Sequence, residues 1–279
     1  MHLNRLIHYF KLWPQGVAQH HPTLSFSDQG AFGHYGDWQL RSVFQPILQP
    51  QGERLLPFAH EALLRVSDSA QKSIATDHFF ANAISPDEVV YLDRFSRVIH
   101  ALNFSNQAHS GDRLFLNVHG RHLLGIATGK HGATFEALLS YCGLHPSQVV
   151  LEIVESEIDD LAVLDAAIRS YKQKGFRIAI DDFGAGHSNF DRLWQLTPDL
   201  VKLDRSLLLQ SASNKRARVV LPKLIDIIHD LGASVVCEGI ETAEQHALAV
   251  QSGADLLQGF YYARPNAQLL GSSRLSEAA

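Results

Sequence analysis

The feature that most constrains the fold of this chain is a regular alternation of short apolar runs with longer amphipathic segments. The runs are rich in β-branched residues and have the length of buried strands. They cover residues 42–48, 59–66, 114–118, 149–154, 177–180, 200–203, 235–237 and 256–262. Eight predicted strands that alternate with helices indicate an α/β fold, and their number is that of a closed (β/α)8 barrel. An open doubly wound sheet is the structural alternative.

The segments between the runs carry apolar residues at the i, i+3, i+4 spacing of a helix that packs on a core. In one of them Leu161, Leu164 and Ile168 share a face, and Gly175 follows as a helix-stop signal. The predicted helices cover about 77–106, 133–141, 159–174, 188–196, 213–231 and 242–252.

This pattern divides the 279 residues into three parts. Residues 39–270 hold the alternation and are predicted to form the barrel domain. Residues 1–38 form an N-terminal arm, in which we expect a short helix near 3–13 and then irregular chain; residues 271–279 form a C-terminal tail. The arm is interpreted either as a packing arm or as a segment that binds a protein partner, because it is too short for a sensory domain of its own.

Composition and charge limit the partners of the chain. Hydrophobic residues make up 46% of it, which supports a large core, and its net charge is -5 at pH 7. A negative balance argues against polymeric nucleic acid, whose binding depends on clustered Lys and Arg. No run approaches eighteen apolar residues, and the N-terminus lacks the apolar stretch of a signal peptide, so we expect no membrane span and a cytoplasmic location.

Polar residues interrupt or directly follow seven of the predicted strands. They are Glu61, Asn117, Glu152 with Glu155, Asp181 with Asp182, Lys202, Glu238 and Gln258. Any one of them has an ordinary structural explanation, such as a helix cap, an ion pair or an exposed edge. Buried polar groups are costly unless they are paired or bind a metal, and the carboxyl ends of barrel strands converge on one mouth. We therefore predict a functional site at that mouth.

The residue types select the chemistry of this site. All the acids and the amide of Asn117 offer oxygen, and no Cys or His stands among them, so Mg²⁺ or Mn²⁺ is favoured over zinc. The adjacent Asp181 and Asp182 suit a pair of ions. Two metal ions activate water and stabilise charge in a phosphoryl displacement, and Lys202 would add a fixed cation near the attacked phosphate or its water.

The chain also resembles a known family, the EAL-domain cyclic di-GMP phosphodiesterases. The resemblance is carried by six blocks that occur in the family's order and span about residues 42–266. They are Phe44-Gln45-Pro46-Ile47, Glu61-Ala62-Leu63-Leu64-Arg65, Asp181-Asp182-Phe183-Gly184-Ala185-Gly186, Val201-Lys202-Leu203-Asp204, Glu238-Gly239-Ile240-Glu241 and Gln258-Gly259-Phe260-Tyr261, with Pro265 following. It implies a modified (β/α)8 barrel whose first strand is antiparallel to the rest, and hydrolysis of cyclic di-GMP to linear pGpG.

The resemblance also implies a role for each matched residue. The implied metal ligands are Glu61, Asn117, Glu152, Asp181, Asp182 and Glu238, which would hold two ions of Mg²⁺ or Mn²⁺. The implied catalytic set is Lys202 and Gln258, which would position the attacking water, together with Glu61, Glu238 and Glu155. Glu155 would anchor the loop after Asp181-Asp182, which the family uses for metal binding and dimer contact. The implied substrate-binding residues are Gln45, Leu64, Arg65, Asp204 and Pro265.

Two readings of this resemblance stay open. A metal-dependent phosphodiesterase, working as a homodimer, is expected because every implied metal ligand is present. A receptor or protein-interaction module with little turnover is the alternative, since some family members keep the pocket without the activity. Val154 stands where the family commonly has Thr, and Val66 where Trp is frequent; neither change removes a metal ligand.

Overall fold

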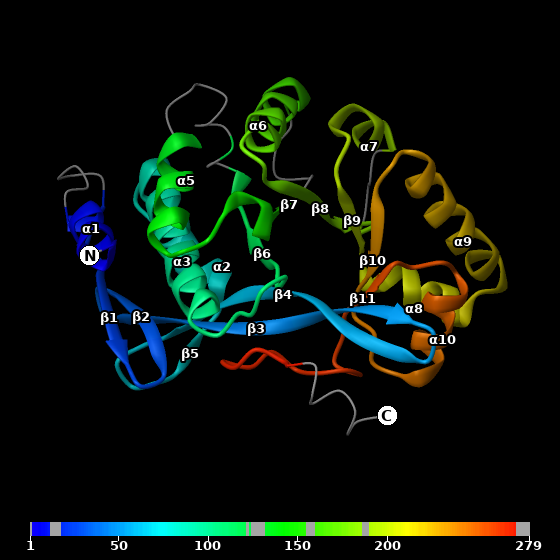
Figure 1. Cartoon of the computed structure of the whole chain (residues 1–279), viewed down its shortest axis with the longest axis horizontal. Helices are drawn as coiled ribbons and strands as arrows, with labels where there is room; N and C mark the ends of the chain where they lie inside the picture. Colours follow the sequence, from blue (N-terminus) through cyan, green and yellow to red (C-terminus); the bar gives the residue numbers. More distant parts are fainter. Residues whose placement is uncertain are drawn as a thin grey trace.

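Eight strands close into a barrel in the computed structural model of the chain (Figure 1). The ring runs in the order β3-β11-β10-β9-β8-β7-β6-β4 and closes through the pairing of β4 with β3. Within it, β3 is antiparallel to both of its neighbours, and the other pairs are parallel. The predicted barrel with an antiparallel first strand is confirmed, and the open-sheet alternative is wrong.

The structure describes residues 2–11, 18–120, 123, 132–154, 160–185 and 190–271. The barrel strands in these ranges are β3 (Trp38–Gln51), β4 (Arg54–Ser67), β6 (Leu114–Asn117), β7 (Val149–Val154), β8 (Arg177–Phe183), β9 (Leu200–Leu203), β10 (Ser234–Cys237) and β11 (Leu256–Leu257). The helices are α1 (His2–Lys11), α2 (Thr76–Ala81), α3 (Pro86–Ser105), α5 (Gly132–Tyr141), α6 (Leu161–Gln173), α7 (Phe190–Leu196), α8 (Arg205–Ser213), α9 (Lys215–Asp230) and α10 (Ala243–Gln251). None of these helices combines the length and hydropathy that a bilayer crossing requires.

The barrel interior contains a layer of apolar side chains, one from each of the eight strands in the described ring. They are Ile47, Ala59, Phe115, Val150, Ala179, Leu200, Val236 and Leu256, and all are buried. A larger apolar cluster lies between the barrel and the helices α3, α5 and α6. The interior is therefore a packed core, on which the polar mouth of the barrel rests.

Two helix boundaries differ from the sequence-based expectation. The segment at 77–106 is two helices, because Ser85 caps α3 by accepting from the Glu88 N–H and Pro86 occupies the first turn. Helix α8 was not predicted; Asp204 caps it by accepting from the N–H of Ser206 at 3.0 Å. The predicted strand at 256–262 is shorter, since only Leu256–Leu257 pairs with its neighbours.

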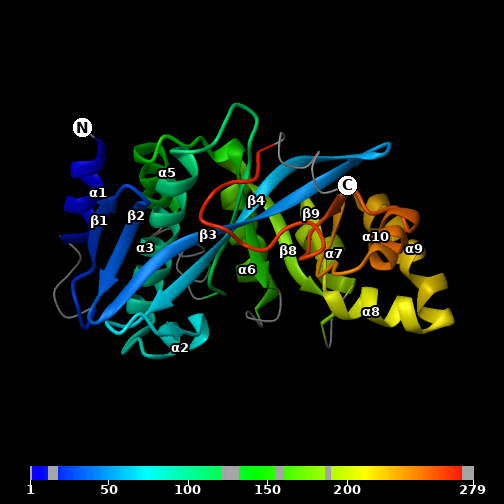
Figure 2. The ribbon, with the colours of Figure 1, turned by 90° about the horizontal axis from the view of Figure 1, so that it is seen from below.

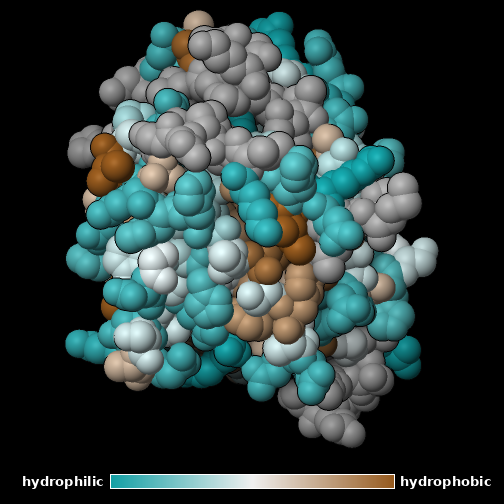
Figure 3. Space-filling view, turned by 90° about the vertical axis from the view of Figure 1, so that its left-hand side faces the viewer, coloured by the Kyte–Doolittle hydropathy of each residue, from teal (hydrophilic) through white to brown (hydrophobic). Residues whose placement is uncertain are grey.

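The N-terminal arm is more ordered than expected. Helix α1 matches the predicted short helix, but the irregular chain expected after it contains the hairpin β1 (Thr23–Ser27) and β2 (Gly30–Tyr35). Strand β2 pairs with β3, so the hairpin extends the sheet beyond the barrel. Arm and hairpin form the end of the molecule seen in Figure 3. The sequence pattern missed the hairpin because β1, although it alternates, has only five residues, and β2 contains two glycines and does not alternate.

Helix α3 holds the arm through specific contacts. The Asn103 side chain accepts from the Ala31 N–H and donates to the Ala31 carbonyl, both at 2.7 Å, in place of a neighbouring strand. Gly33 packs so closely that a Cβ there would lie 2.4 Å from the Phe95 ring. The Tyr91 hydroxyl donates to the carbonyl of Phe10, whose own side chain is buried. These contacts make the arm a part of the core in the described structure.

At the other end of the chain, the segment after β11 crosses β3 and β4, where Figure 2 shows it in red. Asn266 forms an isolated antiparallel bridge with Phe44, and the N–H of Leu270 donates to His60 at 3.0 Å. Residues 263–271 therefore brace the two long strands from outside.

We expect Phe10→Ala to destabilise the whole chain, because a buried aromatic side chain of the core is lost. The expected loss in the free energy of unfolding is about 3 kcal/mol, measured by urea denaturation. Val219→Ala on the exposed face of α9 is the control and should change it by less than about 0.5 kcal/mol. Equal, small effects of the two substitutions would contradict an arm that belongs to the core.

Candidate functional site

The predicted polar residues form a second layer directly above the apolar layer of the barrel. Side chains on a strand alternate between two faces, so residues two positions apart point the same way. The residues two positions beyond the apolar layer, toward the mouth, are Gln45, Glu61, Asn117, Glu152, Asp181, Lys202, Glu238 and Gln258. Because β3 runs antiparallel, Gln45 precedes its apolar residue while the other seven follow theirs. The strand period thus brings all eight to one place.

Lys202 is the centre of this polar layer. Its Nζ lies 2.5 Å from Glu152 Oε1, 2.6 Å from Glu238 Oε1, 3.0 Å from Asp181 Oδ1 and 3.5 Å from Glu61 Oε2. The lysine is only 1% exposed, and Glu152 is equally buried. One ammonium group therefore faces four carboxylates in a site with little access to water, and the negative charge of the cluster exceeds its positive charge.

Two amide side chains hold Glu61 in place. The Gln258 Nε2 donates to Glu61 Oε2 at 2.7 Å, and the Asn117 Nδ2 lies 3.4 Å from Glu61 Oε1. Gln258 is itself buried, and its Oε1 has no hydrogen-bond partner among the described residues. Glu61 is thus held by the two amides, and Lys202 Nζ lies 3.5 Å from its Oε2.

The excess of carboxylates shifts the protonation of the site. Burial raises the pKa of Glu238 to about 8, against the attraction of Lys202 and with added repulsion from Asp181 and Glu61. Burial and the neighbouring Glu61 hold the pKa of Glu152 well above its usual range. Burial alone would lower the pKa of Lys202, but the four carboxylates together raise it well above its ordinary value. The lysine therefore stays charged, and these two acids hold protons more readily than free carboxyl groups, so a cation that binds them competes with protons.

Asp182 completes a trio of acids at the rim. Oxygens of Asp181, Asp182 and Glu238 all lie within 4.8 Å of one another, which is the spacing of a possible metal site. Asp182 has φ 55°, a left-handed conformation that is rare outside glycine, and the ladder between β8 and β9 shifts register here. This distortion lets two successive residues of one strand face the same site. Burial and the charge of Asp181 raise the pKa of Asp182.

A cavity of about 310 Å³ opens over these acids. Residues with no role predicted from sequence also line it, among them Arg205, Glu241 and Phe260. Arg205 Nη2 pairs with Glu241 Oε2 at 2.6 Å, and Phe260 exposes 44% of its surface beside them. The sequence offered only one indication of these three residues, which is that each stands next to or inside a motif block. Gly259 is required nearby, because a Cβ there would lie 2.0 Å from the carbonyl oxygen of Ile240.

The predicted substrate-binding residues fall into three groups. Gln45 lines the acid cavity itself. Leu64 and Arg65 line an adjoining cavity of about 340 Å³ that also reaches Asn117. Asp204 caps α8, and Pro265 is half-buried in the segment that braces β3; neither lines either of these two cavities.

Glu155 lies outside the described residues, as do the side chain of Val154 and residues 186–189 of the loop after Asp182. The expected anchoring of that loop by Glu155 stays a prediction, as do the individual roles given to the site residues.

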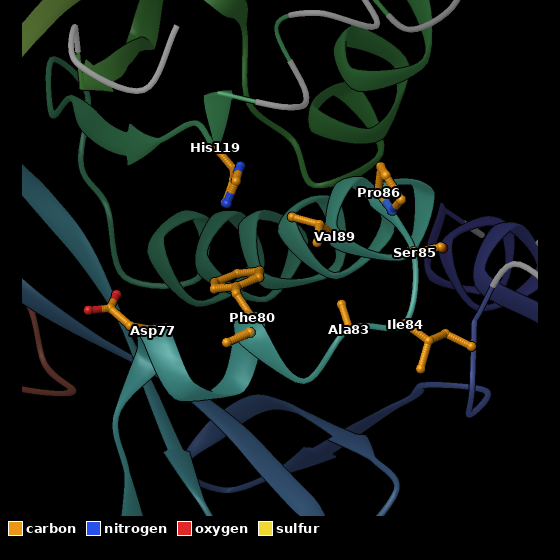
Figure 4. Close-up of a pocket in the computed structure, with 9 residues that line it drawn as sticks. Asp77, Phe80, Ala83, Ile84, Ser85, Pro86, Val89 and His119 are labelled. Atoms are coloured by element: carbon orange, nitrogen blue, oxygen red, sulfur yellow. The ribbon is translucent and has the colours of Figure 1, made fainter.

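A larger hollow of about 550 Å³ lies outside the barrel mouth between α2, the start of α3 and His119 (Figure 4). Apolar and polar groups both line it, and the rings of Phe80 and His119 lie next to each other with centroids 5.9 Å apart. Asp77 and His119 are the titratable groups that line it. Cavity volume alone therefore does not identify the functional site, because the convergent carboxylates line the smaller cavity.

Comparison with known proteins agrees with this geometry. The EAL domain family matches residues 36–265. The probable cyclic di-GMP phosphodiesterase PdeD of Escherichia coli is 32% identical over 229 residues, which cover 79% of this chain and 40% of PdeD. The chain thus spans less than half the length of this relative.

Two solved structures share the fold. The Bacillus subtilis YkuI protein, in complex with substrate c-di-GMP and calcium, is 27% identical with a TM-score of 0.71 over 86% of this chain and 60% of that one. Klebsiella pneumoniae BlrP1, in a calcium/cy-diGMP complex, is 26% identical with a TM-score of 0.67 over 81% of this chain and 56% of that one. Because the family match covers most of the chain, including the whole barrel, this chain belongs to the EAL domain family.

Proposed function

We propose that this chain hydrolyses cyclic di-GMP to linear pGpG with the help of two divalent cations, Mg²⁺ or Mn²⁺. The observation that carries the proposal is the buried polar layer, in which four carboxylates surround Lys202. A layer of acids at the mouth of a barrel is costly to the fold, and its chemistry is that of a metal-assisted displacement at phosphorus. The relatives named for cyclic di-GMP turnover and the complexes with this ligand support the same reaction.

The residues fit divalent cations. Glu152 Oε2 is buried without a hydrogen-bond partner among the described residues, and a hard cation would satisfy it. Glu61, Asn117, Glu152 and Asp181 would hold one ion, and Asp181, Asp182 and Glu238 the other. When bound, the pair of ions supplies a deprotonated water and positive charge opposite the phosphate oxygens.

The chain's own groups then orient the reaction. Lys202 stays charged and is fixed by Glu152 and Glu238, so its ammonium can donate to the attacking water or to the phosphate without reorganising. Gln258 keeps Glu61 in one orientation through its hydrogen bond. Gln45 lines the acid cavity and Arg65 the adjoining one, and we expect each of them to contact one half of the dinucleotide.

Two further proposals follow from family membership. We propose that the protein acts as a homodimer and that it works in the cytoplasm, where the second messenger is found. A protein partner through the N-terminal arm stays a prediction; α1 and the hairpin pack one face of the arm on α3.

Glu61→Ala tests the reaction directly. Turnover of cyclic di-GMP in Mg²⁺ should fall by about 10³-fold, because a metal ligand and the partner of Gln258 are lost. Glu244→Ala, which removes an exposed carboxylate on α10, is the control and should leave turnover unchanged. Product formation is measured by chromatography and ligand binding by calorimetry. Undiminished turnover in Glu61→Ala would refute the assignment, and tight binding by the wild type without turnover would favour a receptor.

Lys202→Met separates the lysine's structural role from its chemical one. Without the ammonium the four carboxylates repel one another, and we expect the cation-free protein to lose about 3–5 kcal/mol of unfolding free energy. Mg²⁺ should restore most of this stability but not turnover. Restored turnover would show that Lys202 has no part in the reaction.

Cation binding should also depend on pH. Because the pKa of Glu238 rises from 4.5 to about 8 on folding, its proton stabilises the cation-free fold, and this contribution is lost as pH rises through about 8. Cations compete with that proton, so the gain in melting temperature on adding Mn²⁺ should be larger at pH of about 8.5 than at about 6. The comparison is made by thermal denaturation, with Glu238→Gln as the control expected to flatten the pH dependence. An equal gain in melting temperature at both pH values would contradict a site at which the cation and the Glu238 proton compete.

A further inference from the structure

Strand β1 leaves a row of backbone groups facing away from the molecule. The two-residue turn closes the hairpin at the pair Ser27 and Gly30, so this pair and the pair of Ser25 with Phe32 exchange hydrogen bonds. The alternation then directs the N–H and C=O groups of Leu24 and Phe26 to the open side. Among the described residues, no partner strand or side chain accepts from or donates to these four groups. The sheet therefore ends on an edge ready for one more strand.

The side chains of this edge suit contact with protein. Leu24 and Phe26 lie on the face of the hairpin that packs toward α3, because they stand opposite Gly33 and Ala31. Leu24 is half-buried against the core, while Phe26 exposes 46% of its surface. Figure 3 shows hydrophobic surface at the centre of this end of the molecule, ringed by hydrophilic side chains. Exposed edge strands usually carry charged side chains that prevent pairing with another chain, but Thr23–Ser27 has none.

We propose that β1 pairs antiparallel with β1 of a second copy of this chain. In this arrangement Leu24 lies opposite Phe26 of the partner subunit, and the two exchange hydrogen bonds. Ser25 then lies opposite the partner's Ser25 on the two-fold axis. Four backbone hydrogen bonds form, and each exposed Phe26 packs against a Leu24 on the same face. The two hairpins become the centre of one continuous sheet.

A second copy fits this edge better than an unrelated strand for two reasons. The outward groups at Leu24 and Phe26 are placed symmetrically about Ser25, so the edge is complementary to itself under a two-fold rotation, as a closed dimer requires. The strand carries no charge, so self-pairing sets no like charges opposite each other. The other open end of the described sheet, β5 (Ser73–Ile74), has only two residues and cannot offer an equal register.

The pairing lies at the far end of the arm and takes no residue from the acid cavity. It is therefore independent of the proposed hydrolysis, and a variant that lacks this pairing should keep its turnover. It also differs from a contact at the loop after Asp181-Asp182, which the family resemblance implies.

Ser25→Cys tests the register. Cα atoms of a directly opposed pair without hydrogen bonds lie about 4.5 Å apart, which a disulfide can bridge. Mild oxidation of this full-length variant should give a covalent dimer on a non-reducing gel, reversed by reductant. The native Cys142 and Cys237 are buried and should not contribute. The matched control Ser27→Cys, which would face the partner's Thr23, should stay monomeric on the gel.

Phe26→Lys tests the association itself. Light scattering over a range of protein concentrations should show a larger assembly for the wild type than for Phe26→Lys, with unchanged turnover and an unchanged circular dichroism spectrum. Trp194→Lys on α7 replaces a similarly exposed aromatic side chain and should leave the wild-type assembly intact. The proposal is overturned by a monomeric wild type, by equal masses of the wild type and Phe26→Lys, or by equal cross-linking of the two cysteine variants.

Discussion

The two-residue period of the barrel strands is the constraint on which the rest of this structure depends. It stacks a polar layer on an apolar one, and each strand contributes a member to both. The apolar layer keeps water out from below and fixes the strand positions by packing. The polar residues stand on the same strands, so the packing that fixes the strands also fixes groups such as Glu61 and Lys202, which hold one another as well. A shift of one residue in any strand would turn its members of both layers outward and so remove a member of the site.

The carboxylates of the polar layer outnumber its one lysine. Lys202 offsets part of the repulsion among its four carboxylate neighbours, and burial raises the pKa values of Glu238 and Glu152, so that protonation of either acid would lower the repulsion further. Buried ion pairs seldom stabilise a fold by themselves, since desolvation costs as much as the attraction returns. Such an arrangement is better explained by what it binds. Divalent cations would replace the protons, and the lysine would keep its charge and its position for the substrate.

The barrel and the polar layer could be predicted from the sequence because both depend on local periodicity. A charged residue such as Glu152 or Lys202 within an apolar run signals an inward-facing polar group, whatever the details of packing. The hairpin before the barrel could not be predicted this way. Its strands are held by tertiary contacts, as where Asn103 takes the place of a neighbouring strand for Ala31. The pair of Arg205 with Glu241 was missed for the same reason, since 36 residues separate its members.

The account is tested most directly by incubating the purified chain with cyclic di-GMP and separating the products by chromatography. One sample contains Mg²⁺ or Mn²⁺, and a matched sample contains an excess of chelator. The account predicts linear pGpG in the first sample and intact cyclic dinucleotide in the second, with turnover restored when the cation is returned. Intact cyclic di-GMP in both samples, from folded protein with saturating cation, would contradict it.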